Sequence, residues 1–160
     1  MWDAARNHKE DEVKSILSGI QSPTMMRRVI NYTDAFGQSS LFVACLGEGN
    51  INIVLALLDK GCDVNTQTND NHKGPGDTPL IISCFTGHVD YAKALIRHDA
   101  NIGLQRKNKA DATFIASQGG HLEILELLTE KDPSFVDRKG FDGMTPLIAS
   151  ALNGHLSIFR

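Results

Sequence analysis

Histidine is the residue type in this sequence that best suits acid–base or metal chemistry. None of the six histidines shows the H-x-x-x-H or H-E-x-x-H spacing that places two imidazoles on one helix face. His88, His121 and His155 each follow a glycine, at intervals of 33 and then 34 residues. A structural place within a repeat explains these three better than catalysis does. The other three, which are isolated in the sequence, are His8, His72 and His98.

Nucleophiles and phosphate-binding loops are equally weakly indicated. Cys45, Cys62 and Cys84 are odd in number and lack paired or metal-ligand spacing, which favours reduced thiols that pack as small apolar residues. The Gly-Pro-Gly of residues 74–76 is not part of a G-x-x-x-x-G-K-[ST] loop, and G-x-S-x-G does not occur. The sequence therefore predicts no catalytic residue, cofactor or metal ligand, and a chain that is not an enzyme.

Composition limits the kind of partner. A formal net charge of -3 and a pI near 6.0 argue against nucleic acid, because phosphate neutralisation needs a basic face. The apolar fraction of 41% suffices for a core, but no apolar run approaches the roughly 20 residues of a membrane span. We expect a monomeric, cytoplasmic module whose partner is a protein or peptide.

A repeated pattern supplies the elements that position these residues. An apolar run opens with Thr-Pro-Leu-Ile at residues 78–81 and 145–148, and in degraded form at 39–42 and 111–114. An amphipathic run with apolar residues at helical spacing follows each Gly-His. Each unit is therefore predicted to be a helix, a tight turn, a second helix and a loop. The predicted N-caps, first helical prolines and turn glycines are Thr78, Thr145, Pro79, Pro146, Gly87, Gly120 and Gly154.

This combination of a 33-residue period, Thr-Pro-Leu, a small-residue pair, Gly-His and a Leu-Leu helix resembles the ankyrin repeat. The resemblance implies an all-α solenoid of stacked helix-turn-helix units with β-hairpin fingers, forming a single array over residues 1–160. The predicted units cover residues 1–30 (an N-terminal cap), 31–65, 66–103, 104–137 and 138–160, the last being incomplete.

The sequence departs from the family pattern in several places. The histidine usual after Thr-Pro-Leu is replaced by apolar residues, so packing should replace its hydrogen bonds; these residues are Phe42, Ile81, Phe114 and Ile148. The fourth unit has Lys109 at the finger glycine position and lacks Thr-Pro, so we predict that it is the least stable. The junctions at residues 18–37 and 66–77 are long, and the second should be an extended, mobile finger.

The resemblance implies a binding surface on the concave face, formed by the fingers and first helices. Its exposed positions should also include Pro75, Asp77, Asn108, Gln118 and Asp142. The predicted partner-binding residues are Phe36, Leu46, Phe85, Phe141 and Leu152 for apolar contact, and Arg106, Lys107 and Arg138 for selection by charge. The alternative is that the basic residues only form a solvated, solubilising rim at the finger tips, and this simpler interpretation is favoured.

Asn65 ends the stretch Leu57 to Asn65, which resembles the sites that an asparaginyl hydroxylase modifies in ankyrin arrays. The simpler interpretation is that Asn65 ends the repeat and bonds the hairpin backbone.

Two functional hypotheses follow. The first is a protein-protein interaction module, a scaffold or adaptor that binds a partner on its concave face. The second is a targeting or autoinhibitory domain of a larger enzyme or pathogen effector whose catalytic part lies beyond Arg160. An enzymatic array is a weaker third option, because the sequence shows no acid–base or metal constellation.

Overall fold

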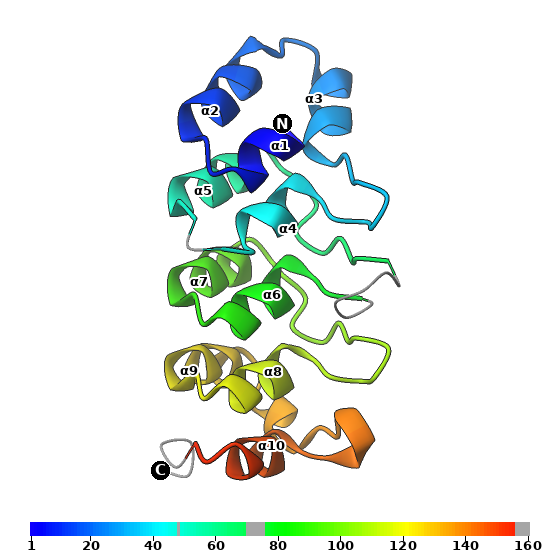
Figure 1. Cartoon of the computed structure of the whole chain (residues 1–160), viewed down its shortest axis with the longest axis vertical. Coiled ribbons are helices and arrows are strands. Elements are labelled where there is room, and N and C mark those ends of the chain that lie inside the picture. Colours follow the sequence, from blue (N-terminus) through cyan, green and yellow to red (C-terminus); the bar gives the residue numbers. More distant parts are fainter. Residues whose placement is uncertain (48, 70–75, 156–160) are drawn as a thin grey trace.

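Pairs of helices stack along one axis in the structure, a computed structural model that describes residues 1–47, 49–69 and 76–155 (Figure 1). The pairs are α1 (Trp2–Arg6) with α2 (Glu10–Gly19), α4 (Ser40–Ala44) with α5 (Ile51–Asp59), α6 (Pro79–Thr86) with α7 (Val89–Arg97), and α8 (Ala112–Gly119) with α9 (Leu122–Lys131). The connections contain α3 (Pro23–Ile30) and the 3-10 turns η1 (Pro133–Asp137) and η2 (Phe141–Gly143), and α10 (Pro146–Leu152) follows.

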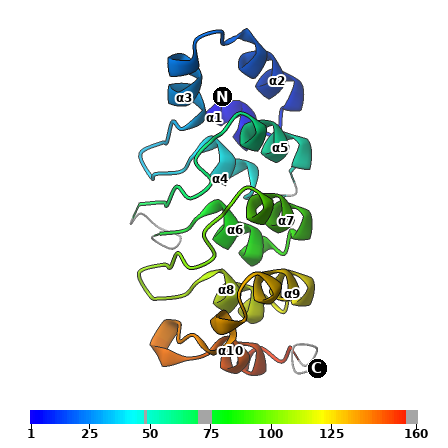
Figure 2. The same ribbon diagram turned by 180° about the vertical axis from the view of Figure 1, so that it is seen from behind.

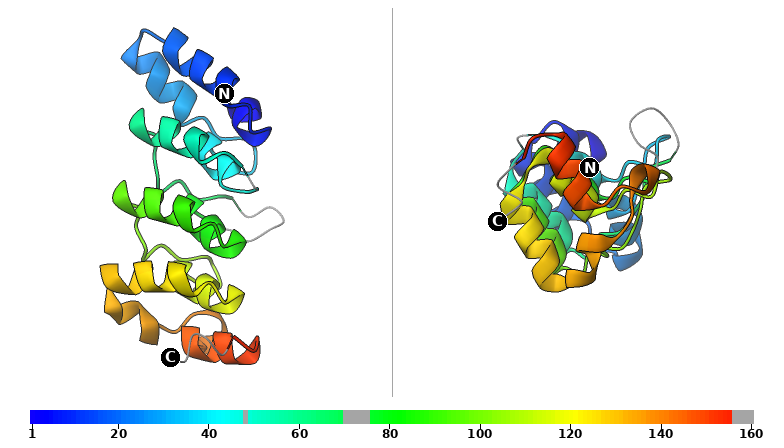
Figure 3. Two further views of the ribbon diagram at one scale, coloured as in Figure 1. Left: turned by 90° about the vertical axis from the view of Figure 1, so that its left-hand side faces the viewer. Right: turned by 90° about the horizontal axis from the view of Figure 1, so that it is seen from below.

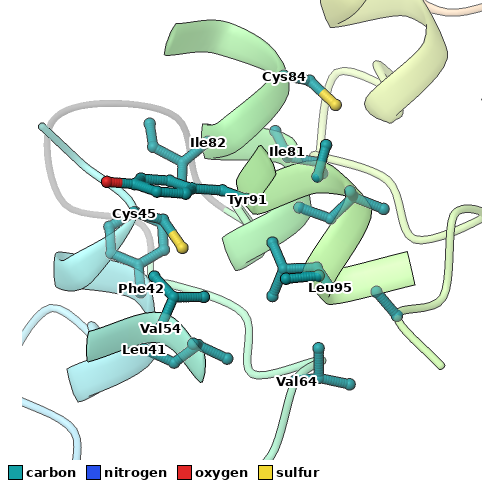
Figure 4. Close-up of a cluster of buried hydrophobic side chains, with 14 of the residues drawn as sticks. Leu41, Phe42, Cys45, Val54, Val64, Ile81, Ile82, Cys84, Tyr91 and Leu95 are labelled. Carbon is teal, nitrogen blue, oxygen red and sulfur yellow. The ribbon is translucent and has the colours of Figure 1, made fainter. Parts of the chain in front are cut away.

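The helices form two layers, with the first helices α4, α6, α8 and α10 in one and α5, α7 and α9 in the other (Figure 2). The loops before the first helices project to one side, which gives each unit an L-shape in the end-on view (Figure 3). Apolar side chains from neighbouring units interlock between the layers. Leu41, Val54, Ile81 and Leu95 are all at most 1% exposed in the cluster that joins the second and third units (Figure 4).

Each first helix from α4 onward begins at a side-chain cap. The Thr78 and Thr145 hydroxyls accept from the backbone N–H three residues later, at 3.1 and 3.4 Å, as predicted. Ser39 and Asp111 accept the same bond in the degraded units, at 3.1 and 3.0 Å. The units that lack Thr-Pro therefore still have a side-chain N-cap at the start of their first helix. The predicted turn glycines hold as well, with φ between 76° and 77° at Gly87, Gly120 and Gly154.

The fingers are hairpin-like turns. The backbone N–H groups of Asp34, Arg106 and Gly140 each donate to the carbonyl four residues later, at 3.1, 2.9 and 2.8 Å. In the described part of the chain the β-pairing is limited to an isolated bridge between Thr33 and Ser39. The hairpin character that the family resemblance implies therefore resides, among the residues the structure describes, in turn hydrogen bonds without extended strands.

The junction of residues 18–37 contains the helix α3, which the sequence analysis missed. The Ser22 hydroxyl accepts from Met25 N at 3.4 Å, and Pro23 takes the first helical position. Ser-Pro was thus the overlooked signal, since it repeats the chemistry of Thr-Pro. In the other long junction, residues 70–75, with Pro75 and His72, lie outside the described residues. The two described ends of this predicted mobile segment are joined by backbone hydrogen bonds, from Thr68 N to the Asp77 carbonyl and from Gly76 N to the Thr68 carbonyl, both at 3.0 Å. The mobility of the segment stays a prediction.

Three of the four apolar replacements for the family histidine pack as predicted. Phe42, Ile81 and Phe114 are 4%, 1% and 3% exposed. The prediction is wrong for Ile148, which is 46% exposed, because no described element covers that side of α10. Phe114 packs directly against the next finger, where a Cβ on Gly140 would come within 2.7 Å of its ring.

Lys109 lies at the finger position where the other units have Gly37, Gly76 and Gly143, and its φ of 66° is left-handed. We expect Lys109→Gly to raise the free energy of unfolding by about 0.5–1 kcal/mol, because the left-handed penalty of a side chain exceeds the entropy cost of glycine. Urea unfolding would measure the change. Lys107→Gly is the matched control: it removes the same charge where φ is not positive, and should not stabilise. Equal effects of the two substitutions would contradict a backbone origin.

Candidate protein-interaction surface

A column of side chains runs along the first helices at the position seven residues after each N-cap. Two helical turns separate this position from the cap, so it lies on the same helix face in α6, α8 and α10, whereas in the second unit it follows the C-cap of α4. The helix column consists of Leu46, Phe85, Gln118 and Leu152. Its three apolar members are 39%, 62% and 72% exposed, and Gln118 is exposed too. The repeat register therefore lines up one outward side chain per unit.

Two exposed aromatic side chains lie on the fingers that precede first helices of the stack. Phe36 and Phe141 are 42% and 43% exposed, as the sequence analysis predicted. The backbone of Phe36 is held on both sides: its N–H donates to Asp34 Oδ1 at 2.9 Å, and its carbonyl accepts from Asn69 N at 2.8 Å. A fixed backbone with an exposed ring suits a binding surface, since little order has to be gained on contact.

Arg106 binds a carboxylate of this chain. Its Nε donates to Asp77 Oδ1 on the preceding finger, and the two side chains are only 14% and 3% exposed. Burial raises the pKa of Asp77, and the hydrogen bond and charge of Arg106 oppose that rise. The expectation that Asp77 is an exposed groove position is wrong, because this ion pair joins the third and fourth units.

Arg138 forms a longer ion pair of the same kind, with a carboxylate of the preceding unit. Its Nη1 lies 3.7 Å from Asp111 Oδ2 and donates to the carbonyl of Gly103 at 3.4 Å. Its guanidinium also lies 4.7 Å from the ring centroid of Phe135. Burial raises the pKa of Asp111, whereas its hydrogen bond from the Phe114 N–H lowers it. Partner binding by the two arginines stays a prediction, but the structure already uses their charge to join units.

Besides Arg138, whose side chain is 43% exposed, these fingers carry exposed lysines. Lys107 and Lys109 are exposed on the fourth finger, as is Lys139 on the fifth. The contribution of Lys107 to partner binding stays a prediction, and Lys109 and Lys139 were not among the predicted partner-binding residues.

The Gly-His histidines pack as structural residues. The His121 ring lies against Gly87 of the preceding unit, where a Cβ would come within 2.4 Å, and the His155 ring lies in the same way against Gly120. His155 Nε2 also lies 3.0 Å from the carbonyl of Gln118. His88 differs, since its Nδ1 lies 2.7 Å from Thr86 Oγ1 in its own unit.

Asn65 takes part in a repeated hydrogen bond between units. Its Oδ1 accepts from the backbone N–H of Asn101 at 2.8 Å, as Asn31 Oδ1 accepts from Asp63 N at 2.7 Å. Asn65 thus has a structural role, but its bond reaches the equivalent position of the next unit and not the hairpin backbone as predicted. Its hydroxylation stays a prediction, which mass spectrometry of the native protein would test.

Groups suited to other chemistry are few in the described ranges. They contain no cluster of three or more His, Cys, Asp and Glu side chains that could hold a metal. Cys45 and Cys84 are buried, and burial raises the pKa of the Cys45 thiol to about 12, so it is protonated at neutral pH. A membrane-spanning helix is not found among the described residues, whose longest helices have 10 residues.

Stacked helix pairs with projecting fingers and one outward side chain per unit define a solenoid repeat protein. The sequence matches the family described as ankyrin repeats (3 copies) over residues 1–106, 65–139 and 98–160. The chain belongs to the ankyrin-repeat family, whose repeats are protein-interaction modules.

Relatives with this similarity are larger and diverse. The chain is 29% identical over 118 residues to the ankyrin repeat and KH domain-containing protein mask-1 of Caenorhabditis elegans, covering 72% of this chain and 4% of that protein. It is 36% identical over 83 residues to the protein fem-1 homolog A-like of Mus musculus, covering 52% and 12%. It is 27% identical to the probable E3 ubiquitin-protein ligase XBOS32 of rice (Oryza sativa subsp. japonica), covering 96% and 35%. The chain thus spans only a minor part of each relative.

Proposed function

We propose that this chain is an adaptor-type interaction module that binds a protein or peptide on the concave face formed by its fingers and first helices. One observation carries the proposal: five large apolar side chains that the repeat register assigns to that face are between 39% and 72% exposed, namely Phe36, Leu46, Phe85, Phe141 and Leu152. Contiguous exposed apolar groups mark interaction sites, because water leaves them when a partner covers them. We expect the module to act as a monomer in the cytoplasm.

The mechanism is docking onto a preorganised surface. Neighbouring units are joined by a shared core, by the Arg106–Asp77 pair and by hydrogen bonds such as that from Asn101 N to Asn65. The binding face therefore loses little conformational entropy when a partner docks. Full burial of each exposed apolar side chain contributes about 1.5–3 kcal/mol before the costs of association.

The proposal predicts that Phe85→Asp/Phe141→Asp lowers affinity for the partner at least about tenfold, because two desolvated apolar contacts become charged. The test is affinity capture from cell lysate with the wild type and the double variant side by side. Circular dichroism would verify that both are folded.

Leu55→Asp is the matched control for this capture. Leu55 is 38% exposed on the second helix α5, away from the first-helix layer. The Leu55→Asp variant should therefore still capture the partner. A partner captured equally by the wild type and the Phe85→Asp/Phe141→Asp variant would contradict binding on the concave face.

A second candidate function is a targeting or autoinhibitory domain of a larger enzyme. The similarity to the probable ubiquitin ligase favours it, since 96% of this chain aligns with 35% of that protein. Sequencing the transcript beyond the codon for Arg160 would test it. A catalytic domain in the same reading frame would support it, and a stop codon directly after Arg160 would exclude a catalytic part that follows this chain.

A further inference from the structure

We propose that a groove at the α10 end of the stack binds an amphipathic helix of a partner protein, with a basic residue in the first turn of that helix. The groove has a volume of about 290 Å³ and lies where α8, α9, η1 and α10 meet (Figure 1). It is lined by different side chains from the concave face, so this inference goes beyond the proposed function. Apolar walls, buried hydroxyl groups and an acidic edge carry it.

The walls of the groove contain apolar side chains that are partly exposed. Leu122 and Val136 are 39% and 41% exposed, and Leu147 is 49% exposed. Leu80 holds the position of Leu147 in the third unit, two residues after the N-cap, and is only 1% exposed. A position that the next unit covers elsewhere in the stack is therefore open here among the described residues. Burial of such apolar surface against a partner is favourable.

Two buried hydroxyl groups line the groove without a hydrogen-bond partner among the described residues. Thr113 Oγ1 and Ser117 Oγ lie one turn apart on α8, in residues that are 0% and 1% exposed. Buried polar atoms have a partner in most native structures, because an unsatisfied one costs free energy. A polar side chain of the occupant can supply that partner, since a hydroxyl group both donates and accepts.

A helix suits the groove better than an extended peptide does. The α9 side of the groove is a stripe at helical spacing that runs for two turns, about 10 Å, and consists of Leu122, Leu125, Glu126 and Thr129. An extended peptide would bury backbone N–H and C=O groups against the apolar walls, whereas a helix satisfies its own backbone. The stack already uses this arrangement, because α9 packs against α7.

The contact between α7 and α9 indicates which charge the docked helix carries. Lys93 Nζ of α7 lies 2.8 Å from Glu123 Oε1 in the first turn of α9. Glu126 holds the position of Lys93 one repeat later, so the sign is reversed in the fourth unit. A helix that docks on α9 as α9 docks on α7 therefore gains from Lys or Arg where Glu123 stands. The chain has Ser157 at that repeat position, outside the described residues, and serine supplies no cation.

The charges around the groove keep its edge acidic. Glu126 and Asp137 line it and are exposed, and no Lys or Arg occurs in the part of the lining that the structure describes. Lys131 lies nine residues after Leu122, on the opposite side of α9, because each residue advances about 100°. Arg138 is bound to a carboxylate and a carbonyl of the preceding unit. The charges of residues 122–139 outside ion pairs are four carboxylates and two cations: Glu126, Glu130, Asp132, Asp137, Lys131 and Lys139.

The test is selection from a phage-displayed library of random peptides of about 16 residues, or four helical turns, panned against the whole chain. The expected result is enrichment of amphipathic sequences that contain Lys or Arg. Their affinity, measured by fluorescence anisotropy, should fall at least about tenfold on Leu122→Asp/Leu147→Asp. Both leucines are partly exposed, so this variant should fold, which circular dichroism would verify.

Charge exchange tests the acidic edge. Glu126→Lys should weaken the enriched peptides about fivefold, and it should bind peptides with Glu in place of the cation better than the wild type does. Asp59→Lys is the matched control: it reverses an exposed carboxylate at the end of α5 and should leave the affinity unchanged. Enriched peptides that need Leu122 and Leu147 but carry no basic residue would overturn the selection of a cation.

Thr113→Val tests the hydroxyl groups. It should weaken the enriched peptides without lowering the free energy of unfolding, because it removes a buried group that has no partner in the free chain. A purely structural role of Thr113 would give the opposite result, with a lower free energy of unfolding and an unchanged affinity.

The remaining outcomes assign the groove to another occupant or exclude it. Enriched peptides that are lost on Phe85→Asp and kept on Leu122→Asp/Leu147→Asp would overturn this site and support the concave face. No enrichment above the starting library would overturn helix binding, while the capture experiment decides the proposed function. Enrichment only on a chain that ends at His155 would assign the groove to residues 156–160. Self-association in sedimentation that Leu147→Asp abolishes would assign it to a second copy of this chain.

Discussion

Gly87→Ala is expected to lower the free energy of unfolding by about 3 kcal/mol or more, because two penalties combine. The φ of Gly87 is +77°, a left-handed conformation that costs a residue with a Cβ about 1–2 kcal/mol. The new methyl group would also come within 2.4 Å of His121 Cε1 and 2.7 Å of its Nδ1. The ring lies between two units, so relieving this overlap adds an overpacking cost of about 1–3 kcal/mol.

Gly61→Ala isolates the backbone part of this effect. Gly61 has a φ of +74°, and a Cβ there would meet no atom within 4 Å. It should cost only the left-handed penalty of about 1–2 kcal/mol in urea unfolding. Adding His121→Ala to Gly87→Ala should recover part of the excess. Equal costs at the two glycines would contradict a role of the histidine ring in packing one unit against the next.

The sequence predicted the helix pairs well because their signals are local. An N-cap, a proline at the first helical position and a left-handed glycine each act within a few residues. Even the units without Thr-Pro begin their first helix with an N-cap, since the Ser39 and Asp111 side chains accept the same backbone hydrogen bond as Thr78. The helix α3 was missed although Ser22 and Pro23 carry the same local signal, because their stretch lies outside the repeat register.

The exposed members of the candidate surface were predictable for the same reason. Once the repeat register is known, the position seven residues after a cap fixes which side chain faces outward, as for Leu46 and Phe85. The ion pairs were not predictable from these signals. Arg106 and Asp77 are separated by 29 residues, and their contact depends on how one unit stacks on the next. Charge alone placed Arg106 on the binding surface, whereas the stack turns it toward a buried carboxylate.

Arg106→Gln is expected to lower the free energy of unfolding at neutral pH by about 3 kcal/mol, because it leaves the buried negative charge of Asp77 without a positive partner. The Asp77 side chain is 3% exposed, and Arg106 donates to its carboxylate. A buried pair contributes little net stability, but removing one partner leaves the other uncompensated. Asp77→Asn added to Arg106→Gln should therefore restore most of the loss. Urea unfolding of Arg106→Gln, Asp77→Asn and the double variant gives the coupling free energy between the two side chains.

The loss of unfolding free energy in Arg106→Gln should also depend on pH in a defined direction. Burial already raises the pKa of Asp77, and Arg106 is the group that opposes this rise. Without the arginine the pKa rises further above its unfolded value of about 3.9. A carboxyl with a raised pKa favours the folded state most below the unfolded pKa, and that advantage disappears as pH rises through the folded pKa. The deficit of Arg106→Gln relative to the wild type should therefore shrink between pH 7 and about pH 4.

Arg138→Gln provides the control for both effects. The Arg138 side chain is 43% exposed and its Nη1 lies 3.7 Å from Asp111 Oδ2, so water can replace it and the cost should stay below about 1 kcal/mol. Asp111 also keeps its hydrogen bond from the Phe114 N–H, which supports the carboxylate without the arginine. An Arg106→Gln deficit that stays constant with pH, or that Asp77→Asn fails to relieve, would mean that Arg106 acts by packing its side chain. A large deficit that follows pH would instead identify the Asp77 charge as the electrostatic link between the third and fourth units.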